Sequence, residues 1–135
     1  MIDSYAMMAY FEDEAGADIV AGILEEIVGT QSKGYMSIIN WGEIYYNIFR
    51  VQGEEVAEKI IAHLGRYPIE LVNADQSLTY EAARLKGKYK IAYADCFAAA
   101  LAVRLDAQVV TGDPEFRKLE REISIVWVVK PSGSK

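Results

Sequence analysis

The sequence has little cysteine, no long apolar run and no leader-like start, and each shortage excludes a class of protein. Its one cysteine, Cys96, cannot form a disulfide within the chain, and its apolar surroundings favour an inert core residue. No apolar stretch approaches the roughly 20 residues that a membrane-spanning helix needs. The start, Met1-Ile2-Asp3, lacks the basic and then apolar pattern of a secretion signal. We therefore expect a soluble cytoplasmic protein.

Basic residues are outnumbered by acidic ones. The 14 lysines and arginines face 20 aspartates and glutamates, which gives a net charge of −6. Because nucleic-acid binding depends on clustered cations, this balance excludes binding over the whole surface and leaves a local basic patch or a bound metal ion. The densest basic run comprises Arg84, Lys86, Lys88 and Lys90. It fits a solvated helix end as well as an RNA-binding patch.

Apolar residues are abundant and fall into short segments separated by glycine, proline and polar residues. At 52% of 135 residues they suffice for one domain with a conventional core. We expect residues 1–130 to form it and residues 131–135 to be a disordered tail. Periodicity predicts strands over residues 1–3, 35–37, 69–72, 108–111 and 123–129. It predicts helices over residues 4–11, 15–30, 38–50, 54–64, 76–86, 93–105 and 114–120. Strands separated by helices throughout predict an α/β domain with a mainly parallel sheet.

The stretch from Tyr93 to Phe116 carries two carboxylates at the ends of regular elements. Its first half is apolar all round except for Asp95 near its start and Arg104 near its end, as in a buried helix. Its second half is a β-branched strand that turns at Gly112 and Asp113. Taken singly, Asp95 also fits a helix cap, and Asp113 a turn residue before proline.

Topology brings these two acids to two others. In a parallel α/β sheet each strand ends at the edge where the next helix begins, and ligands bind outside that edge. Asp3 follows the first strand, Glu43 lies early in the helix after the second, and Asp113 follows the strand over residues 108–111. Asp95 begins the helix that leads back across the sheet into that same strand. We therefore expect all four acids to lie together.

Such a cluster of carboxylates predicts a metal site. Carboxylates held close together repel one another unless a cation is present. Oxygen ligands without histidine or cysteine favour hard ions such as Mg²⁺ or Mn²⁺, whose bound waters can become nucleophiles. The chemistry that this arrangement predicts is hydrolysis of phosphodiester bonds.

Four segments of the chain together resemble the PIN domain family. They are Asp3-Ser4 after the first strand, Ser37 followed by Glu43, the run Asp95–Ala102, and the run Val110–Phe116 with Asp113 after Val-Val-Thr. The size and layout look most like VapC-type toxins of bacterial and archaeal toxin–antitoxin pairs. The resemblance covers nearly the whole chain and implies a three-layer α/β/α fold with a mainly parallel central sheet.

The resemblance implies an endoribonuclease that depends on Mg²⁺ or Mn²⁺ and whose catalytic acids are Asp3, Glu43, Asp95 and Asp113. Our hypothesis is that the three aspartates bind the metal directly, while Glu43 binds it through water or orients the attacking water. The basic run would hold the RNA backbone near this site. Family members leave a 5′ phosphate, commonly form homodimers, and are inhibited by a small cognate antitoxin.

The resemblance also implies supporting residues and shows two departures. Ser4 and Thr111 match positions that usually support the acids by hydrogen bonding, and Glu115 matches a place where some members carry another acid. The first strand is shorter than usual in the family, so we expect Asp3 to be held less firmly. The residues after Asp3, beginning with Tyr5, are bulkier than the small aliphatic ones common there.

Three other interpretations stay open at this point. A non-catalytic binding module would keep the fold and use apolar helix residues such as Tyr45, Tyr46 and Phe49 for a partner, although aromatic residues at helical spacing are more often core. A solitary PIN nuclease would act in RNA processing without an antitoxin. A phosphoaspartyl enzyme with Asp3 as nucleophile is disfavoured, because position 5 is tyrosine rather than a second aspartate.

Overall fold

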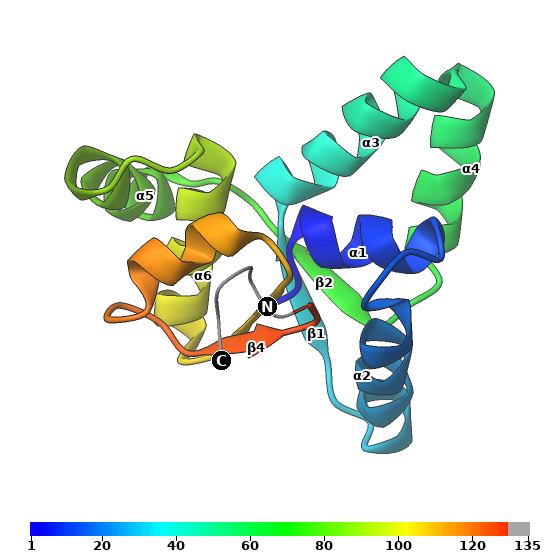
Figure 1. Cartoon of the computed structure of the whole chain (residues 1–135), viewed down its shortest axis with the longest axis horizontal. Coiled ribbons are helices and arrows are strands. Elements are labelled where there is room, and N and C mark those ends of the chain that lie inside the picture. The colour runs from blue at the N-terminus through cyan, green and yellow to red at the C-terminus, as the bar shows by residue number, and fades with distance from the viewer. Residues whose placement is uncertain (130–135) are drawn as a thin grey trace.

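The computed structural model describes residues 1–129 of the chain (Figure 1). The predicted disordered tail, residues 131–135, lies outside the described residues, as does residue 130. The helices are α1 (Ser4–Phe11), α2 (Ala17–Gly29), α3 (Ile38–Gln52), α4 (Glu54–Leu64), α5 (Gln76–Lys88) and α6 (Tyr93–Leu105), with a 3₁₀ helix η1 (Pro114–Leu119). The strands are β1 (Gly34–Ser37), β2 (Ile69–Val72), β3 (Val109–Thr111) and β4 (Ile125–Trp127).

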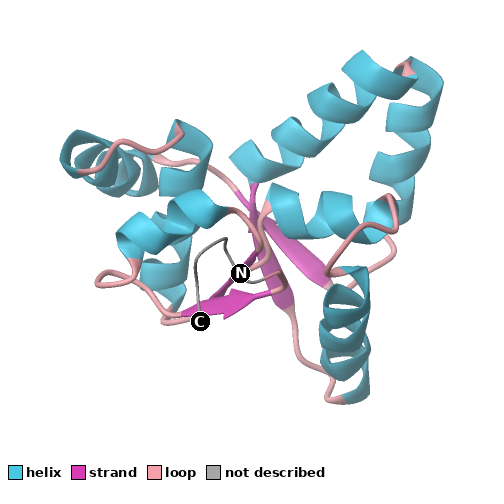
Figure 2. Cartoon of the chain, viewed as in Figure 1, coloured by secondary structure: helices cyan, strands magenta, loops and turns pink. Residues whose placement is uncertain are grey.

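The N-terminal residues join two pairs of strands into one sheet. β1 pairs with β2, and β3 with β4, both in parallel. Between these pairs, Ile2 forms a parallel bridge with Val110, and the Ile2 amide donates a 2.8 Å hydrogen bond to the Tyr35 carbonyl. The order across the sheet is therefore β2, β1, residues 1–3, β3 and β4. Figure 2 shows these strands in the middle of the molecule, with helices on both sides.

The two faces of the sheet bury separate apolar clusters, because side chains alternate along each strand. On β3, Val109 belongs to the cluster formed with α5 and α6, whereas Val110 belongs to the cluster formed with α1 to α4. The same alternation separates Met1 from Ile2. In Figure 1, α5 and α6 lie on one side of the strands, and α1 to α4 on the other. The structure thus confirms the predicted three-layer α/β/α arrangement with parallel strands.

Several boundaries differ from the sequence prediction by one or two residues. Helix α2 begins at Ala17 rather than residue 15, because Gly16 has a φ of 95°, outside the helical region. Strand β4 begins at Ile125 rather than residue 123, because the Ile123 amide still donates to Leu119 in the preceding turn. The strand predicted over residues 1–3 amounts to the single bridge at Ile2. None of these shifts moves an element to another layer.

The sequence has no apolar run long enough for a membrane-spanning helix, and the helices of the structure can be compared with that expectation. The longest helix, α3, has 15 residues. Within residues 1–129, no helix combines the length and the apolar character needed to cross a membrane.

Candidate active site

Asp3 lies where the N-terminal bridge meets α1, and its carboxylate is fixed on both sides. It caps the helix, since Oδ1 accepts a 2.9 Å hydrogen bond from the Ala6 amide. Its Oδ2 accepts a 2.5 Å bond from the Thr111 hydroxyl at the end of β3. Only 1% of the residue is exposed. The expectation that a short first strand would hold Asp3 loosely is wrong, because bonds from two other elements hold its side chain.

Thr111 orients two of the predicted site residues at once. Its hydroxyl donates its one hydrogen to Asp3, and the same oxygen accepts a 3.0 Å bond from the Asp113 amide. Asp113 in turn caps η1, where its Oδ1 accepts a 2.9 Å bond from the Glu115 amide and Pro114 begins the helix. The end of β3 therefore carries half-buried Asp113 to the edge of the sheet where Asp3 lies, as the topology predicts.

Glu43 reaches the same edge from α3. Its Oε1 accepts hydrogen bonds from the Ser4 hydroxyl at 2.8 Å and from Asn40 Nδ2 at 3.1 Å. Ser4 follows Asp3 directly, so its bond ties Glu43 to the start of α1. Asn40 Nδ2 also approaches the Ala94 carbonyl oxygen at 3.5 Å, which ties α3 to the first turn of α6.

Asp95 lies in that first turn and is 7% exposed. Burial, followed by the negative charges of Asp113, Asp3 and Glu43, raises the pKa of the Asp95 carboxyl to about 8. Burial likewise raises the pKa of Asp3 to about 7, although the bonds from Thr111 and Ala6 oppose this shift. The four predicted acids thus lie within electrostatic reach of one another.

The chemistry of this cluster suits a divalent metal ion held by oxygen. Asp3 and Asp95 carry a cost of desolvation and repulsion that a cation would relieve. Carboxylate oxygens without nitrogen or sulfur ligands favour Mg²⁺ or Mn²⁺. Among residues 1–129, however, no three histidine, cysteine, aspartate or glutamate side chains are already arranged as a metal-binding group. The residues therefore fit a metal by type and location rather than by a preformed cage.

The four basic residues predicted to contact RNA do not lie together. Three lie on α5 and Lys90 lies in the loop that follows it, and they face two different cavities. Successive helical residues turn by about 100°, so residues two apart lie on nearly opposite sides. Lys86 and Lys90 line a cavity of about 380 Å³ together with Asp95, Asp113 and Glu115. These two lysines therefore adjoin the acids.

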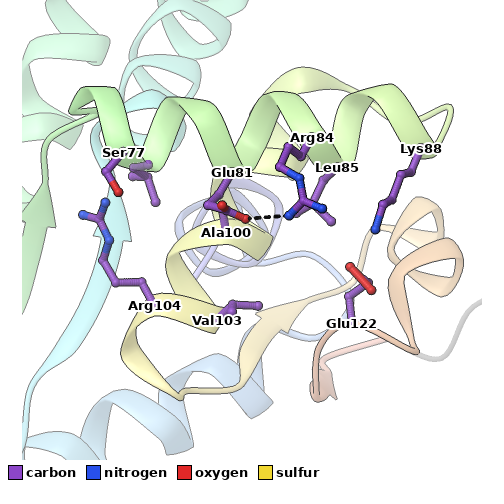
Figure 3. Close-up of a pocket in the computed structure, with 10 residues that line it drawn as sticks. Ser77, Glu81, Arg84, Leu85, Lys88, Ala100, Val103, Arg104 and Glu122 are labelled. Atoms are coloured by element: carbon purple, nitrogen blue, oxygen red, sulfur yellow. Dashed lines mark hydrogen bonds and ion pairs between the residues drawn. The ribbon is translucent and has the colours of Figure 1, made fainter.

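Arg84 and Lys88 face a different cavity, of about 280 Å³, between α5 and α6. Figure 3 shows both side chains directed from α5 toward this cavity, with Arg104 entering it from α6. Arg84 forms an ion pair with Glu81 at 3.4 Å. The structure therefore places Arg84 and Lys88 in a cavity that the four acids do not line.

Two residues of this region were not predicted from the sequence. Asn40 is fully buried, and its Oδ1 has no hydrogen-bond partner within the described chain. Turning its amide round would put that oxygen against two acceptors, so the neighbours fix its orientation. Its position one helical turn before Glu43 was the available signal. Tyr89 lines the cavity beside the acids, and no pattern in the sequence distinguishes it from a core aromatic residue.

The fold and this acid cluster define the class of protein. The PIN domain model matches residues 1–122, and the chain belongs to the PIN domain family, as the resemblance predicts. Members of this family are nucleases. No curated protein matches the sequence.

Among solved structures, this chain is similar in fold to VapC-type PIN domains. A VapBC2 complex from Rickettsia felis, bound to a DNA fragment from its promoter, has 16% identity and a TM-score of 0.74, covering 93% of this chain and 96% of that chain. VapBC-1 from nontypeable Haemophilus influenzae has 17% identity and a TM-score of 0.72, covering 96% and 98%. VapC20 from Mycobacterium tuberculosis, a Sarcin-Ricin loop cleaving toxin, has 11% identity and a TM-score of 0.67, covering 87% and 92%. At such identities the similarity shows the fold.

Proposed function

We propose that this protein is a metal-dependent endoribonuclease and the toxin of a toxin–antitoxin pair. The observation that carries the proposal is the burial of Asp3 and Asp95 in the electrostatic field of each other, of Glu43 and of Asp113. The cluster lies beyond the carboxyl ends of parallel strands, where α/β folds bind their ligands. Membership of the PIN family supports a nuclease rather than a non-catalytic binding module.

The proposed metal ion is Mg²⁺ or Mn²⁺, with Asp3, Asp95 and Asp113 as its ligands. When bound, such an ion supplies charge that stabilises the phosphate in the transition state and lowers the pKa of a water molecule. Each aspartate enters from a different element, so the site depends on the packing of α1, α6 and β3. Glu43 would bind the ion through a water molecule, orient that water for attack and accept its proton.

Neutral donors hold these acids in place without satisfying their charge. Thr111 binds Asp3, while Ser4 and Asn40 bind the same oxygen of Glu43. The other oxygen of Glu43 is thereby left for the water. The basic side chains of the cavity beside the acids then give an acidic protein a local patch for an RNA backbone.

Replacing single acids tests this proposal. Asp95→Asn and Asp113→Asn should each lower RNA cleavage in Mg²⁺ or Mn²⁺ by roughly 100-fold or more, because each removes a charged ligand of the metal ion that stabilises the transition state. Asp106→Asn is the matched control, since Asp106 ends the same helix as Asp95, is exposed and has a φ of 50° that asparagine also adopts. Full activity in both test variants, or cleavage that persists in EDTA, would contradict the proposal.

The proposed partners are a small antitoxin and a second copy of this chain, in the cytoplasm where the RNA substrate is. Solved structures similar to this one are toxin–antitoxin complexes, which supports the first partner. For the second partner, helix α3 offers an exposed apolar surface. Its residues Tyr46, Phe49 and Val51 are 46%, 43% and 80% exposed. Co-expression with the adjoining small reading frame, followed by light scattering on the purified protein, should give a hetero-oligomer built on a dimer. A monomer without a bound small protein contradicts this part.

A further inference from the structure

The cavity beside the acids has walls fixed by lysine side chains. Lys86 Nζ donates a 2.6 Å hydrogen bond to the Ile91 carbonyl oxygen, which holds the loop between α5 and α6 against α5. Lys118 Nζ donates to the Lys90 carbonyl oxygen at 2.8 Å and pairs with Glu115 at 2.8 Å. The loop is thus tied from both sides. A cavity with fixed walls can select a ligand by shape.

The charges around this cavity favour a phosphate near Lys90. Glu115 is already paired with Lys118, so its charge is largely balanced at the rim. The ammonium group of Lys90 is exposed and has no partner in the described part of the chain. Ala92, which also lines the cavity, is the N-cap of α6 and offers no side-chain oxygen to the first amides of the helix. A free ammonium and the start of a helix therefore meet in one place.

The aromatic ring of Tyr89 gives the cavity a surface for a base. Tyr89 is half-buried, packs against the core on the α5 and α6 side of the sheet, and lines the cavity. At about 380 Å³ the cavity is within the range of roughly 300–1,000 Å³ that is typical of small-ligand sites. Aromatic side chains stack on unpaired bases of any sequence, whereas bases within a duplex have their faces covered.

We propose that this cavity is a nucleotide subsite that holds an unpaired RNA nucleotide next to the bond to be cleaved, with the base on Tyr89 and its phosphate at Lys90 and the start of α6. The subsite rests on the proposed function, because Asp95 and Asp113 form its inner wall. Lys86 is a positioning residue, since its ammonium is bonded to the loop.

Binding of a fluorescent, unstructured RNA oligonucleotide tests the subsite in the full chain. Anisotropy is measured in Ca²⁺, with a gel to verify that the probe stays intact. Lys90→Ala should weaken binding roughly fivefold and lower the salt slope by about one. Lys88→Ala is the matched control, because it removes a lysine two residues away that is also exposed, has no partner among residues 1–129 and faces the other cavity. Equal losses in both variants overturn the proposal.

The stacking role of Tyr89 is tested by two variants that keep its packing. Tyr89→Phe should bind as the unchanged protein does, whereas Tyr89→Leu should bind roughly tenfold more weakly with a similar melting temperature. Annealing a complementary strand to the probe should also weaken binding. An unaffected Tyr89→Leu protein, or a duplex bound as well as the single strand, overturns the proposal.

Cleavage assays on the same proteins separate this proposal from the proposed function. Metal-dependent cleavage that is lost in Asp113→Asn but unaffected by Tyr89→Leu and Lys90→Ala supports the nuclease and rejects the subsite. Weakened binding in both subsite variants without any cleavage in Mn²⁺ supports a nucleotide site and rejects the nuclease.

Discussion

Asp95 and Asp75 both lie at the start of helices that pack together, α6 and α5, yet their surroundings shift their pKa values in opposite directions. Asp75 caps α5 and accepts two hydrogen bonds from Arg104, at 2.9 and 3.2 Å, and these bonds lower its pKa. Asp95 is buried among three other acids, and its pKa is raised. A carboxylate with a cation beside it stabilises the fold, whereas one surrounded by carboxylates destabilises the metal-free protein.

Asp3 should show the largest effect of this difference, as a loss of stability with rising pH. Its carboxyl ionises near about pH 3.9 in an unfolded chain but near pH 7 in the folded, metal-free protein. Between these values the folded state binds more protons, so Asp3 lowers the free energy of unfolding by on the order of 4 kcal/mol as pH rises, and Asp95, whose pKa is raised to about 8, adds to this fall. Urea unfolding in EDTA from about pH 4 to pH 8 measures the loss.

Two additions sharpen this experiment. Adding Mg²⁺ near neutral pH should restore stability, because a bound ion favours the charged carboxylates. Asp3→Asn should make the decline shallower and leave the part that Asp95 contributes, because an amide has no charge to bury. A free energy of unfolding that rises over this range would show that Asp3 is ionised and paired.

The second effect is an opposite response to the same substitution at Asp95 and Asp75. In EDTA at a pH near 8, Asp95→Asn should stabilise the protein by roughly 2–3 kcal/mol, because it removes a buried charge from the field of other acids. Asp75→Asn should lower the melting temperature slightly, because asparagine still caps α5 but cannot pair with Arg104. Thermal unfolding of the two variants gives the signs. Destabilisation in both variants would contradict the distinction between Asp75, as a helix cap, and Asp95, as a residue of the acid cluster.

Thr111 gives a third effect, on the bonds that hold the acids. Thr111→Val keeps the shape of the side chain but removes the donor to Asp3 and the acceptor for the Asp113 amide, and should cost about 2 kcal/mol. Thr79→Val is the control, because the Thr79 hydroxyl makes only an exposed bond, to the carbonyl of Asp75 at the start of α5. Denaturant unfolding compares the two losses. Equal losses of unfolding free energy in the two variants would mean that burial does not strengthen the hydrogen bonds of Thr111.

Strand ends and helix starts made the location of the acid cluster predictable from sequence. Asp3 and Asp113 follow strands, and Asp95 begins the helix that returns to β3, so connectivity alone assigned them to one edge. Residue type alone also favours Asp75 as a helix cap, because a cap depends on local hydrogen bonds. The sequence also predicts that the basic run is divided between two sides of the helix, since Lys86 and Lys88 cannot share a helix face.

The contacts between distant elements could not be predicted in the same way. The bond from Ser4 to Glu43 spans 39 positions and depends on how α1 packs against α3. The approach of Asn40 to Ala94 spans 54 positions and depends on α3 meeting α6. Sequence periodicity determines which face of a helix is apolar, but it does not determine which residue of another helix that face meets. Such contacts fix the geometry of the site.

Asn40 provides the smallest predicted effect and the most specific one, because it acts on Glu43 as a positioning residue. Asn40→Ala removes a donor to the Glu43 carboxylate and the link to the start of α6, and should weaken Mn²⁺ binding about tenfold. Asn47→Ala is the matched control on the same helix, since Asn47 bonds the backbone carbonyl of Glu43 rather than its carboxylate. Electron paramagnetic resonance of free Mn²⁺ measures both affinities without RNA. Because Asn40 also buries an oxygen that has no hydrogen-bond partner within residues 1–129, its removal should change the melting temperature little while the affinity falls. Equal affinities in the two variants would mean that Glu43 reaches the metal site without help from Asn40.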